Sequence, residues 1–391
     1  MRRIVVVGVL TVVTVAVAGI VGRLWRYEVY EPPAASSKAA VTGLLGSTAT
    51  EFPRVDTGRR FAFPDDHGAH PQYPTEWWYF TGNLATREGR HFGFQLTFLR
   101  IALSANAPQR ASSWGTNQIY RGQFTLTDVE GKQFLAFEKV SRAGLGLSGA
   151  NPAPVSVWVE NWSVAVTDGD PDASAFHIQA AEGEGAIDLR LTGAKPPVQP
   201  GTDNMLGDTM GARRPFHFYL MTRLRAQGRI RLASGDFAVT GLAWLDRAWG
   251  EVPLSQGPVV LNRFVLQLDD RSDLLCFQLR RRDGTGTPIN AGLRVGADGS
   301  AQTFGRKDIE IDVVETWRSH RDGARYPARW RFRIPSRDID LDVRPVLADQ
   351  EVELSVRYWS GAVAVAGEVS GRTLGGRGHV ELTGYADDAT G

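Results

Sequence analysis

The 391-residue chain has little cysteine, little histidine and no excess of charge of either sign. Its single cysteine, Cys276, excludes an intrachain disulfide and a CxxC metal or redox pair. Only seven histidines occur, none at the HExxH spacing of a metalloprotease, and no Gly-x-Ser-x-Gly sequence frames a nucleophilic serine. The 44 basic and 43 acidic residues leave a formal net charge of +1. This balance argues against nucleic acid as a partner, because phosphate binding needs a basic face.

Long amphipathic helices are also missing after residue 50, and the dominant hydrophobic period is two. Phe92, Phe94, Leu96 and Phe98 alternate with more polar residues, as do Trp330, Phe332 and Ile334. Turn-forming pairs separate such segments, namely Ser234-Gly235, Asp283-Gly284 and Asp298-Gly299. The sequence therefore predicts an all-β chain of antiparallel strands, arranged as barrels or sandwiches.

The N-terminus is predicted to be an export or anchoring segment. No charged residue lies between Arg3 and Arg23, and the apolar run Ile4–Val21 is close to the length that spans a bilayer. Arg2 and Arg3 favour an orientation that places the rest of the chain across the membrane. A small-residue sequence at 16–18 would suit signal cleavage, so residues 1–30 are either a signal peptide or a membrane anchor. Residues 31–58 are predicted to be a flexible linker, and the folded part is expected in the cell envelope, anchored or secreted.

A short internal sequence repeat predicts two similar halves. Phe94-Gln95-Leu96 and Phe277-Gln278-Leu279 each follow an aromatic strand and a charged turn, about half the chain apart. We place the boundary within 228–235, which gives an N-terminal domain at 59–232 and a C-terminal domain at 233–391.

Two histidines, His67 and His70, stand close to Asp65 and Asp66 in a glycine-containing segment. Imidazole and carboxylate groups suit several divalent metals. The alternative is a loop at a barrel mouth, whose side chains bond backbone groups. We favour the loop and predict no metal, because this spacing does not fix a ligand geometry.

The segment that follows, 76–80, is predicted to be a strand. Glu76, Trp78 and Phe80 then share one face, while Trp77 and Tyr79 share the other. Glu76 is either a buried acid of raised pKa or a hydrogen-bond acceptor that holds a neighbouring strand, and we favour the acceptor.

Two later strands carry polar groups among aromatic residues. His217 and Tyr219 share a face, either toward solvent or as a titratable pair inside a barrel. Trp244 and Asp246 share a face of the next strand, where an aspartate against tryptophan is a candidate general acid. The alternative for Asp246 is a structural carboxylate paired with Arg247 or a backbone amide.

Several segments together resemble one family, which joins hydroxyneurosporene synthase (carotenoid 1,2-hydratase) to exported AttH-like proteins. The matching segments run in order over about residues 60–387 and are Asp66–Pro71, Glu76–Gly82, Lys195–Pro197, Arg214–Tyr219, Gly241–Gly250, Tyr326–Pro327, Tyr358–Val363 and Glu381–Tyr385. The resemblance implies two tandem lipocalin-like (calycin) antiparallel β-barrels after the N-terminal apolar segment. It also implies an apolar ligand, because such barrels enclose one.

The hydratase branch of this family adds water to a terminal isoprenoid double bond without a cofactor. The resemblance implies Asp246 as proton donor, with His217 and Tyr219 as further catalytic residues. The ligand-binding residues that we expect are His67, Glu76, Trp77, Trp78, Tyr79, Trp244, Trp249, Tyr358 and Trp359.

Two features favour the exported branch, which is similar to proteins associated with lipoprotein-release (ABC) transporters. One is the N-terminal apolar segment. The other is Ala248, which stands where relatives carry an acidic residue, so Asp246 lacks that proton-relay partner. We therefore expect a cell-envelope protein that binds a lipid or isoprenoid, with a carotenoid 1,2-hydratase-like hydro-lyase as the alternative.

Overall fold

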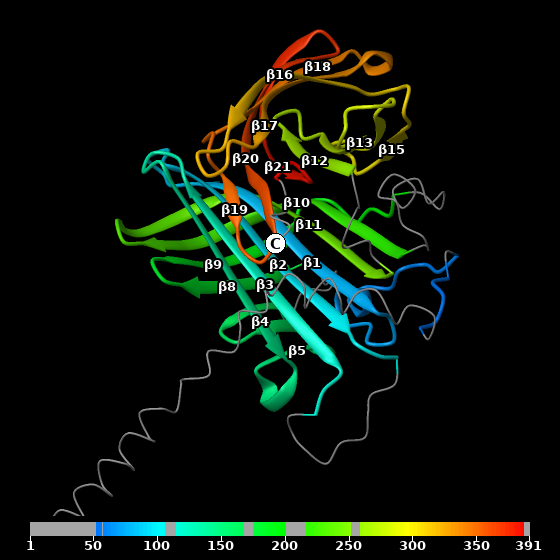
Figure 1. Cartoon of the computed structure of the whole chain (residues 1–391), viewed down its shortest axis with the longest axis vertical. Coiled ribbons are helices and arrows are strands. Elements are labelled where there is room, and N and C mark those ends of the chain that lie inside the picture. Colours follow the sequence, from blue (N-terminus) through cyan, green and yellow to red (C-terminus); the bar gives the residue numbers. More distant parts are fainter. Residues whose placement is uncertain are drawn as a thin grey trace, which may run out of the picture. The chain divides into compact units, whose positions relative to one another are not determined.

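The computed structural model describes residues 52–56, 58–105, 115–167, 175–200, 216–251 and 259–386 (Figure 1). The predicted signal or anchor segment and most of the predicted linker lie outside these residues. Within them, no helix is long and apolar enough to cross a membrane. The only helical elements in the described part are three short 3₁₀ turns: η1 (Asp65–His67), η2 (Gly144–Gly146) and η3 (Pro335–Arg337).

The first sheet has eleven antiparallel strands in the order β4-β3-β2-β1-β11-β10-β9-β8-β7-β6-β5. Its strands are β1 (Thr75–Ala85), β2 (His91–Ala102), β3 (Gln118–Asp128), β4 (Gln133–Arg142), β5 (Ser148–Pro152), β6 (Val155–Val159), β7 (Trp162–Val166), β8 (Ala175–Glu182), β9 (Gly185–Gly193), β10 (Phe216–Leu232) and β11 (Gly235–Gly250). The sheet curls around one apolar core to which strands from β1 to β11 contribute, including Phe80, Phe94, Trp162 and Leu189. The result is a barrel-like unit, as the period-two pattern predicted.

The second sheet follows the path β15-β14-β13-β12-β21-β20-β18-β17-β16, with β19 paired to β20. Its strands are β12 (Val259–Leu268), β13 (Asp273–Arg281), β14 (Ile289–Val295), β15 (Ala301–Phe304), β16 (Glu310–Arg318), β17 (Arg325–Ile334), β18 (Ile339–Pro345), β19 (Glu351–Glu353), β20 (Arg357–Val369) and β21 (Arg372–Thr383).

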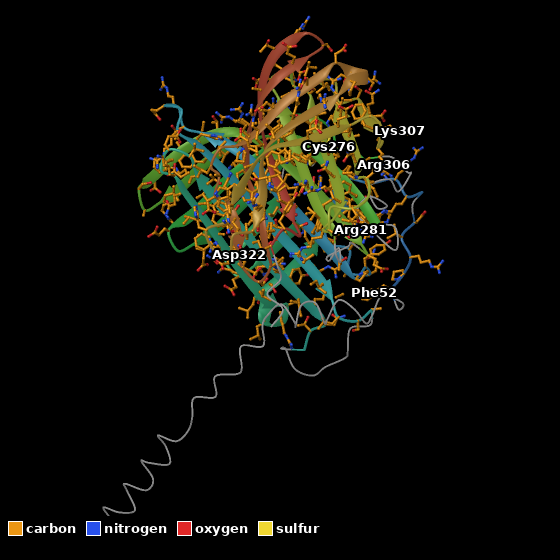
Figure 2. The ribbon with its side chains drawn as sticks, turned by 45° about the horizontal axis from the view of Figure 1, so that its top comes forward. Phe52, Cys276, Arg281, Arg306, Lys307 and Asp322 are labelled. Atoms are coloured by element: carbon orange, nitrogen blue, oxygen red, sulfur yellow. The ribbon has the colours of Figure 1, made fainter. Side chains whose placement is uncertain are left out.

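The second sheet also curls around its own core. Its core contains Phe264, Trp330, Phe332 and Cys276, and the cysteine lies among the strands of this sheet in Figure 2. The Gln278 side chain of β13 donates to the carbonyl of Ile311 in β16 at 3.3 Å, which links two distant strands of the curl. The prediction of two tandem lipocalin-like barrels is confirmed.

The two copies of the short sequence repeat lie in equivalent hairpins of the two sheets. In each unit an early hairpin, β1–β2 or β12–β13, lies beside the last strand of the same sheet, β11 or β21. The predicted boundary at 232/233 needs correction, because Ser234-Gly235 is the tight turn between β10 and β11 of one sheet. The first sheet therefore extends to Gly250, and the second begins at Val259.

Strands β2, β1, β11 and β10 are buried on both faces over part of their length. One face lines the first core. The other packs against the second sheet through an apolar cluster that joins Phe218, Leu220, Trp244 and Ala248 to Leu261, Val265, Leu275 and Phe277. Strands that are buried on both faces have nearly continuous apolar sequences. Polar side chains on these strands are therefore enclosed on either face.

Candidate functional site

Strand register sorts the candidate residues into an inner and an outer set. Residues paired across neighbouring strands point to the same face. The two inner rows, toward the first core, are Arg100–Glu76–Trp249–His217 and Phe98–Trp78–Arg247–Tyr219. The outer row, toward the second sheet, is Thr97–Tyr79–Asp246–Leu220.

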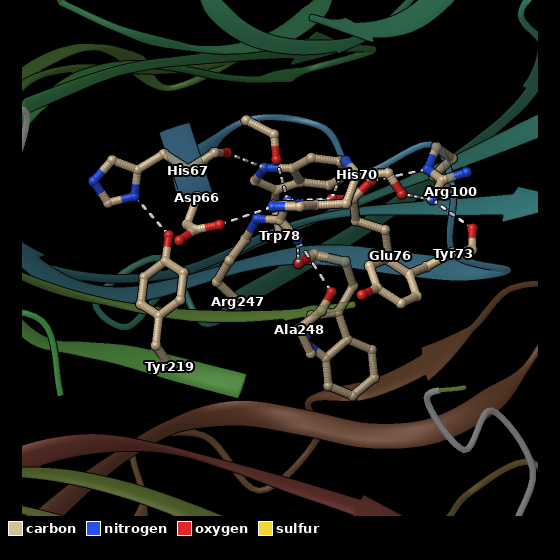
Figure 3. A network of polar contacts seen from close by, with 12 residues as sticks. Asp66, His67, His70, Tyr73, Glu76, Trp78, Arg100, Tyr219, Arg247 and Ala248 are labelled. Atoms are coloured by element: carbon tan, nitrogen blue, oxygen red, sulfur yellow. Dashed lines mark hydrogen bonds and ion pairs between the residues drawn. The ribbon is translucent and has the colours of Figure 1, made fainter. Parts of the chain in front are cut away.

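Glu76 is the centre of a network of polar side chains on the inner side (Figure 3). We name this network the inner cluster; its members are Asp66, His67, His70, Glu76, Arg100, Tyr219 and Arg247. Its carboxylate pairs with Arg247 and accepts from Arg100 Nε at 2.9 Å, and it lies 2.9 Å from His70 Nδ1. Burial by itself would raise the pKa of Glu76, but Arg247, His70 and Arg100 together hold it well below its usual range. Glu76 is therefore an ionised acceptor, as favoured from the sequence, and the alternative of a raised pKa is wrong.

The segment that carries His67 and His70 is held by the same cluster. His70 Nε2 lies 3.0 Å from Asp66, and its ring stacks on Trp249 with a centroid separation of 3.9 Å. His67 Nδ1 is hydrogen-bonded to the Tyr219 hydroxyl at 2.5 Å. The two imidazoles thus have different partners. In the described part of the chain, no three potential ligands gather around a metal position.

His217 is buried inside the first barrel among aromatic rings. Its ring lies 5.1 Å from Trp249, 5.8 Å from Tyr73 and 5.9 Å from Phe61, measured between centroids. Its Nε2 is buried and has no hydrogen-bond partner among the described residues. Burial, followed by the influence of Arg59 and His70, lowers the pKa of His217 to about 4, so this imidazole is neutral near pH 7.

Asp246 lies on the outer face and does not join His217 and Tyr219. Trp244 Nε1 donates to its Oδ1 at 2.6 Å, and Arg263 of the second sheet forms an ion pair with its Oδ2. The alternative pairing of Asp246 with Arg247 is wrong, because adjacent strand residues point to opposite faces. The three residues predicted to be catalytic thus belong to two separate environments.

The outer cluster contains an acid that the sequence analysis did not single out, Glu381 of β21. The Tyr79 hydroxyl donates to Glu381 Oε2 at 2.7 Å. The guanidinium of Arg263 lies over the Tyr79 ring at 4.6 Å and also pairs with Asp246. We name Tyr79, Asp246, Arg263 and Glu381 the inter-sheet cluster.

Two carboxyl groups thus lie close to one arginine in the contact between the sheets. Burial raises the pKa of Asp246 against the attraction of Arg263 and the hydrogen bond from Trp244. Burial also raises the pKa of Glu381, and the neighbouring Asp246 adds to this shift. Carboxyl groups whose pKa is raised by burial are typical of sites that transfer protons.

A chain of neutral polar groups lies next to the inter-sheet cluster. Tyr358 accepts from Gln95 Nε2 and donates to Gln123 Oε1, both at 3.1 Å. Ser360 Oγ lies 2.6 Å from Gln95 Oε1 and 2.8 Å from His379 Nε2. Burial and Arg263 lower the pKa of His379 to about 3, so this imidazole is neutral.

The predicted ligand-binding residues also divide between environments. Glu76, Trp78, His67 and Trp249 lie on the inner side, and Trp77, Tyr79, Trp244 and Tyr358 on the outer side. Trp359 lies in the core of the second sheet, where its Nε1 donates to the carbonyl of Ala348 at 3.0 Å.

Comparisons with known proteins agree with the two-barrel fold. A family model described as AttH-like matches residues 54–385. An AttH structure from Nitrosomonas europaea is 29% identical, with a TM-score of 0.71 and coverage of 86% of this chain and all of that one. Kievitone hydratase from Nectria haematococca has a TM-score of 0.61 at 14% identity, covering 85% of this chain and 96% of its own.

CghA is similar at 13% identity, with a TM-score of 0.52 and coverage of 87% and 95%. These two more distant likenesses concern the fold alone. A comparison with curated proteins finds no match. Because the family model spans most of the sequence and both barrels, the chain belongs to the AttH-like family.

Proposed function

We propose that this protein binds an apolar molecule of the isoprenoid or lipid type where its two sheets meet, and adds water to a double bond of it by acid–base chemistry. The observation that carries the proposal is the inter-sheet cluster, in which two carboxyl groups lie close to Arg263 between the two sheets. Protonation of an alkene needs an acid that still holds its proton, and burial favours this form by raising the pKa of both carboxyl groups.

The surroundings of the cluster suit the rest of such a reaction. Trp77, Tyr79 and Tyr358 supply aromatic faces, which tolerate a carbocation through their π electrons. The chain of neutral polar groups through Gln95 and Ser360 offers partners for one water molecule. A protein of the same fold is named a hydratase, which supports water addition as the reaction type.

The test is incubation of the purified full chain with acyclic carotenoids in water labelled with heavy oxygen. We expect label in a product alcohol, and its loss in Asp246→Asn and Glu381→Gln. Asp188→Asn is the control, because this exposed carboxylate pairs with His177 on the first sheet, away from the cluster. Absence of labelled product from every acyclic isoprenoid would reject the hydratase function.

A second candidate is binding without turnover, as expected for a carrier that serves an envelope transporter. It is favoured by the inner cluster, where Glu76, Asp66 and Tyr219 already have protein partners. Native mass spectrometry of the purified protein would then detect a bound lipid, while the heavy-oxygen assay would give no product.

We also propose that the protein acts in the cell envelope. The support is the apolar run 4–21 after two arginines, which would carry the chain to or across a membrane. Fractionation of cells that produce the full chain tests this location, and recovery in the cytoplasmic fraction alone would contradict it.

A further inference from the structure

We propose that Glu381, rather than Asp246, is the acid that gives its proton to the bound molecule. This inference rests on the proposed function, because it names the proton donor of that reaction. It differs from the assignment that the family resemblance implies for Asp246.

Glu381 is more accessible to a bound molecule than Asp246 is. Asp246 is 2% exposed, and both of its oxygens are engaged, Oδ1 by Trp244 and Oδ2 by Arg263. Glu381 is half-buried, so part of its surface remains accessible although it lies between the two sheets. Only its Oε2 has a hydrogen-bond partner among the described residues. A proton donor must reach its substrate within hydrogen-bond distance, and only Glu381 is free to do so.

The two acids also differ in how their negative charge is balanced. Asp246 and Arg263 form an ion pair and balance each other. Glu381 has no ion pair of its own within the described part of the chain. The charged and titratable groups that act on it are Asp246, Arg263, Tyr79, Arg121 and Tyr358. The neutral His379 stands two residues earlier on the same strand. Of the two cations, Arg263 is held by Asp246, and Arg121 donates to Glu138 at 2.6 Å. A second negative charge here would lack a counter-ion, so the proton remains on Glu381.

Tyr79 fixes which oxygen carries that proton. Its hydroxyl donates to Oε2, and its ring is held beneath Arg263. The proton therefore belongs on Oε1, the oxygen without a partner. Tyr79 acts as a positioning residue for the acid.

The proposed hydration has two steps, protonation of the double bond and addition of water. The π electrons of the double bond take the proton from Glu381 Oε1 and form a C–H bond, which leaves a carboxylate and a tertiary carbocation. A water molecule gives an electron pair to the cation and forms the C–O bond. The same water loses a proton to the Glu381 carboxylate, which restores the acid. The sum is addition of one water molecule.

Infrared spectroscopy tests the resting proton independently of turnover. We expect the full-length protein at pH 7 to show the carbonyl band of a protonated carboxyl group. The band should shift after labelling with glutamate that carries ¹³C in its side-chain carboxyl, remain unshifted after the same labelling of aspartate, and be absent from Glu381→Gln. Glu351→Gln is the matched control, because Glu351 also accepts from a tyrosine hydroxyl but is paired with Arg357. A missing band, or a band that shifts with labelled aspartate, would overturn the proposal, and the wild-type labelling needs no variant to fold.

Activity provides the second test. We expect Glu381→Gln to lower the hydration rate by about 100-fold or more, the size of a general-acid contribution. The rate should fall as the pH rises through the pKa of Glu381. Tyr79→Phe removes a hydrogen bond that lowers this pKa, so the alkaline limb should move to higher pH.

An unchanged rate in Glu381→Gln would reject this acid but leave the hydratase function standing. Failure of every substrate would reject the hydratase function, while the infrared result would still decide whether Glu381 holds the proton.

Discussion

The inner and inter-sheet clusters are built from the same residue types and differ in their balance of charge. In the inner cluster, Glu76 has both Arg247 and Arg100, so its pKa is lowered. In the inter-sheet cluster, Asp246 and Glu381 have Arg263 between them, and both pKa values are raised. Both clusters lie on strands β1 and β11, on opposite faces.

Under the proposed function, this difference in charge balance separates a structural site from a catalytic one. A carboxylate with two buried cations is fixed in one protonation state, and this state holds segments together. A carboxyl group that lacks its own counter-ion has a raised pKa and keeps its proton to higher pH than an ordinary carboxyl group. Burial of a charged residue alone does not distinguish the two, whereas the ratio of cations to carboxylates does.

The largest expected effect is on the inner cluster. Glu76→Gln leaves Arg247 and Arg100 buried without their carboxylate, which should lower the free energy of unfolding by about 3–5 kcal/mol. Urea unfolding followed by tryptophan fluorescence measures it. Asp188→Asn, at an exposed pair, should change stability by less than about 1 kcal/mol. Equal midpoints for Glu76→Gln and the wild type would contradict the structural role.

A smaller effect is expected from His217, which lies on the inner side, in the pH dependence of stability. The pKa of His217 is lowered to about 4 from 6.5, so the unfolded chain binds its proton at higher pH than the folded chain. Stability is therefore lost as the pH falls from about 6.5 to 4, by about 2–3 kcal/mol from this group. We expect His217→Gln to lose that much less over the same range. Thermal unfolding at a series of pH values tests this, and parallel curves for variant and wild type would refute it.

The contact between the sheets can be strained without changing charge. A Cβ at Gly93 would lie 2.5 Å from the Ala362 Cβ of the second sheet. Gly93→Ala should therefore cost about 1–3 kcal/mol through overpacking. At Gly305 the nearest atom is a flexible side-chain oxygen at 3.7 Å, so Gly305→Ala is the control. Equal unfolding midpoints for the two variants would show that the sheets yield at this position.

The smallest expected effect sharpens the comparison most. Glu381→Gln is the same substitution as Glu76→Gln, but it replaces a neutral acid by a neutral amide that still accepts from Tyr79. We expect a change in unfolding free energy below about 1 kcal/mol at pH 7. A loss as large as that of Glu76→Gln would show that Glu381 is ionised in the folded protein.

The raised pKa of Glu381 also fixes the direction in which stability changes with pH. The folded chain holds this proton at higher pH than the unfolded chain, so its contribution to stability declines as the pH rises between the two pKa values. In Glu381→Gln this part of the pH dependence should vanish, which thermal unfolding between pH 5 and 8 would measure.

Much of the fold was predictable from alternation. The faces of Glu76, Trp77, Trp78 and Tyr79 follow from the period of two, and so does the face that His217 and Tyr219 share. Alternation alone left open whether this shared face points inward or toward solvent. The same rule shows that Arg247 points away from Asp246, although the two are adjacent in sequence. The true partner, Arg263, belongs to the second sheet, and no local pattern specifies which strands of two sheets meet.

Glu381 illustrates the limit of local patterns. Its strand alternates normally, and nothing near it in the sequence marks an acid of unusual pKa. Its role comes from Tyr79, about three hundred residues earlier, and from the shortage of cations around it. The one usable signal was that Glu381 opens the last family-like segment, Glu381–Tyr385.

The pairing of β1 with β11 has a consequence for the order of events during synthesis. Thr75 pairs with Gly250, so the first strand made is completed by a strand made much later. Until then β1 presents an unpaired edge on that side, which is a template for wrong pairing. Contacts so far apart in sequence slow folding toward the millisecond-to-second range. A truncated chain that lacks β11 would leave this edge of β1 unpaired, and we expect it to self-associate more readily than the full chain.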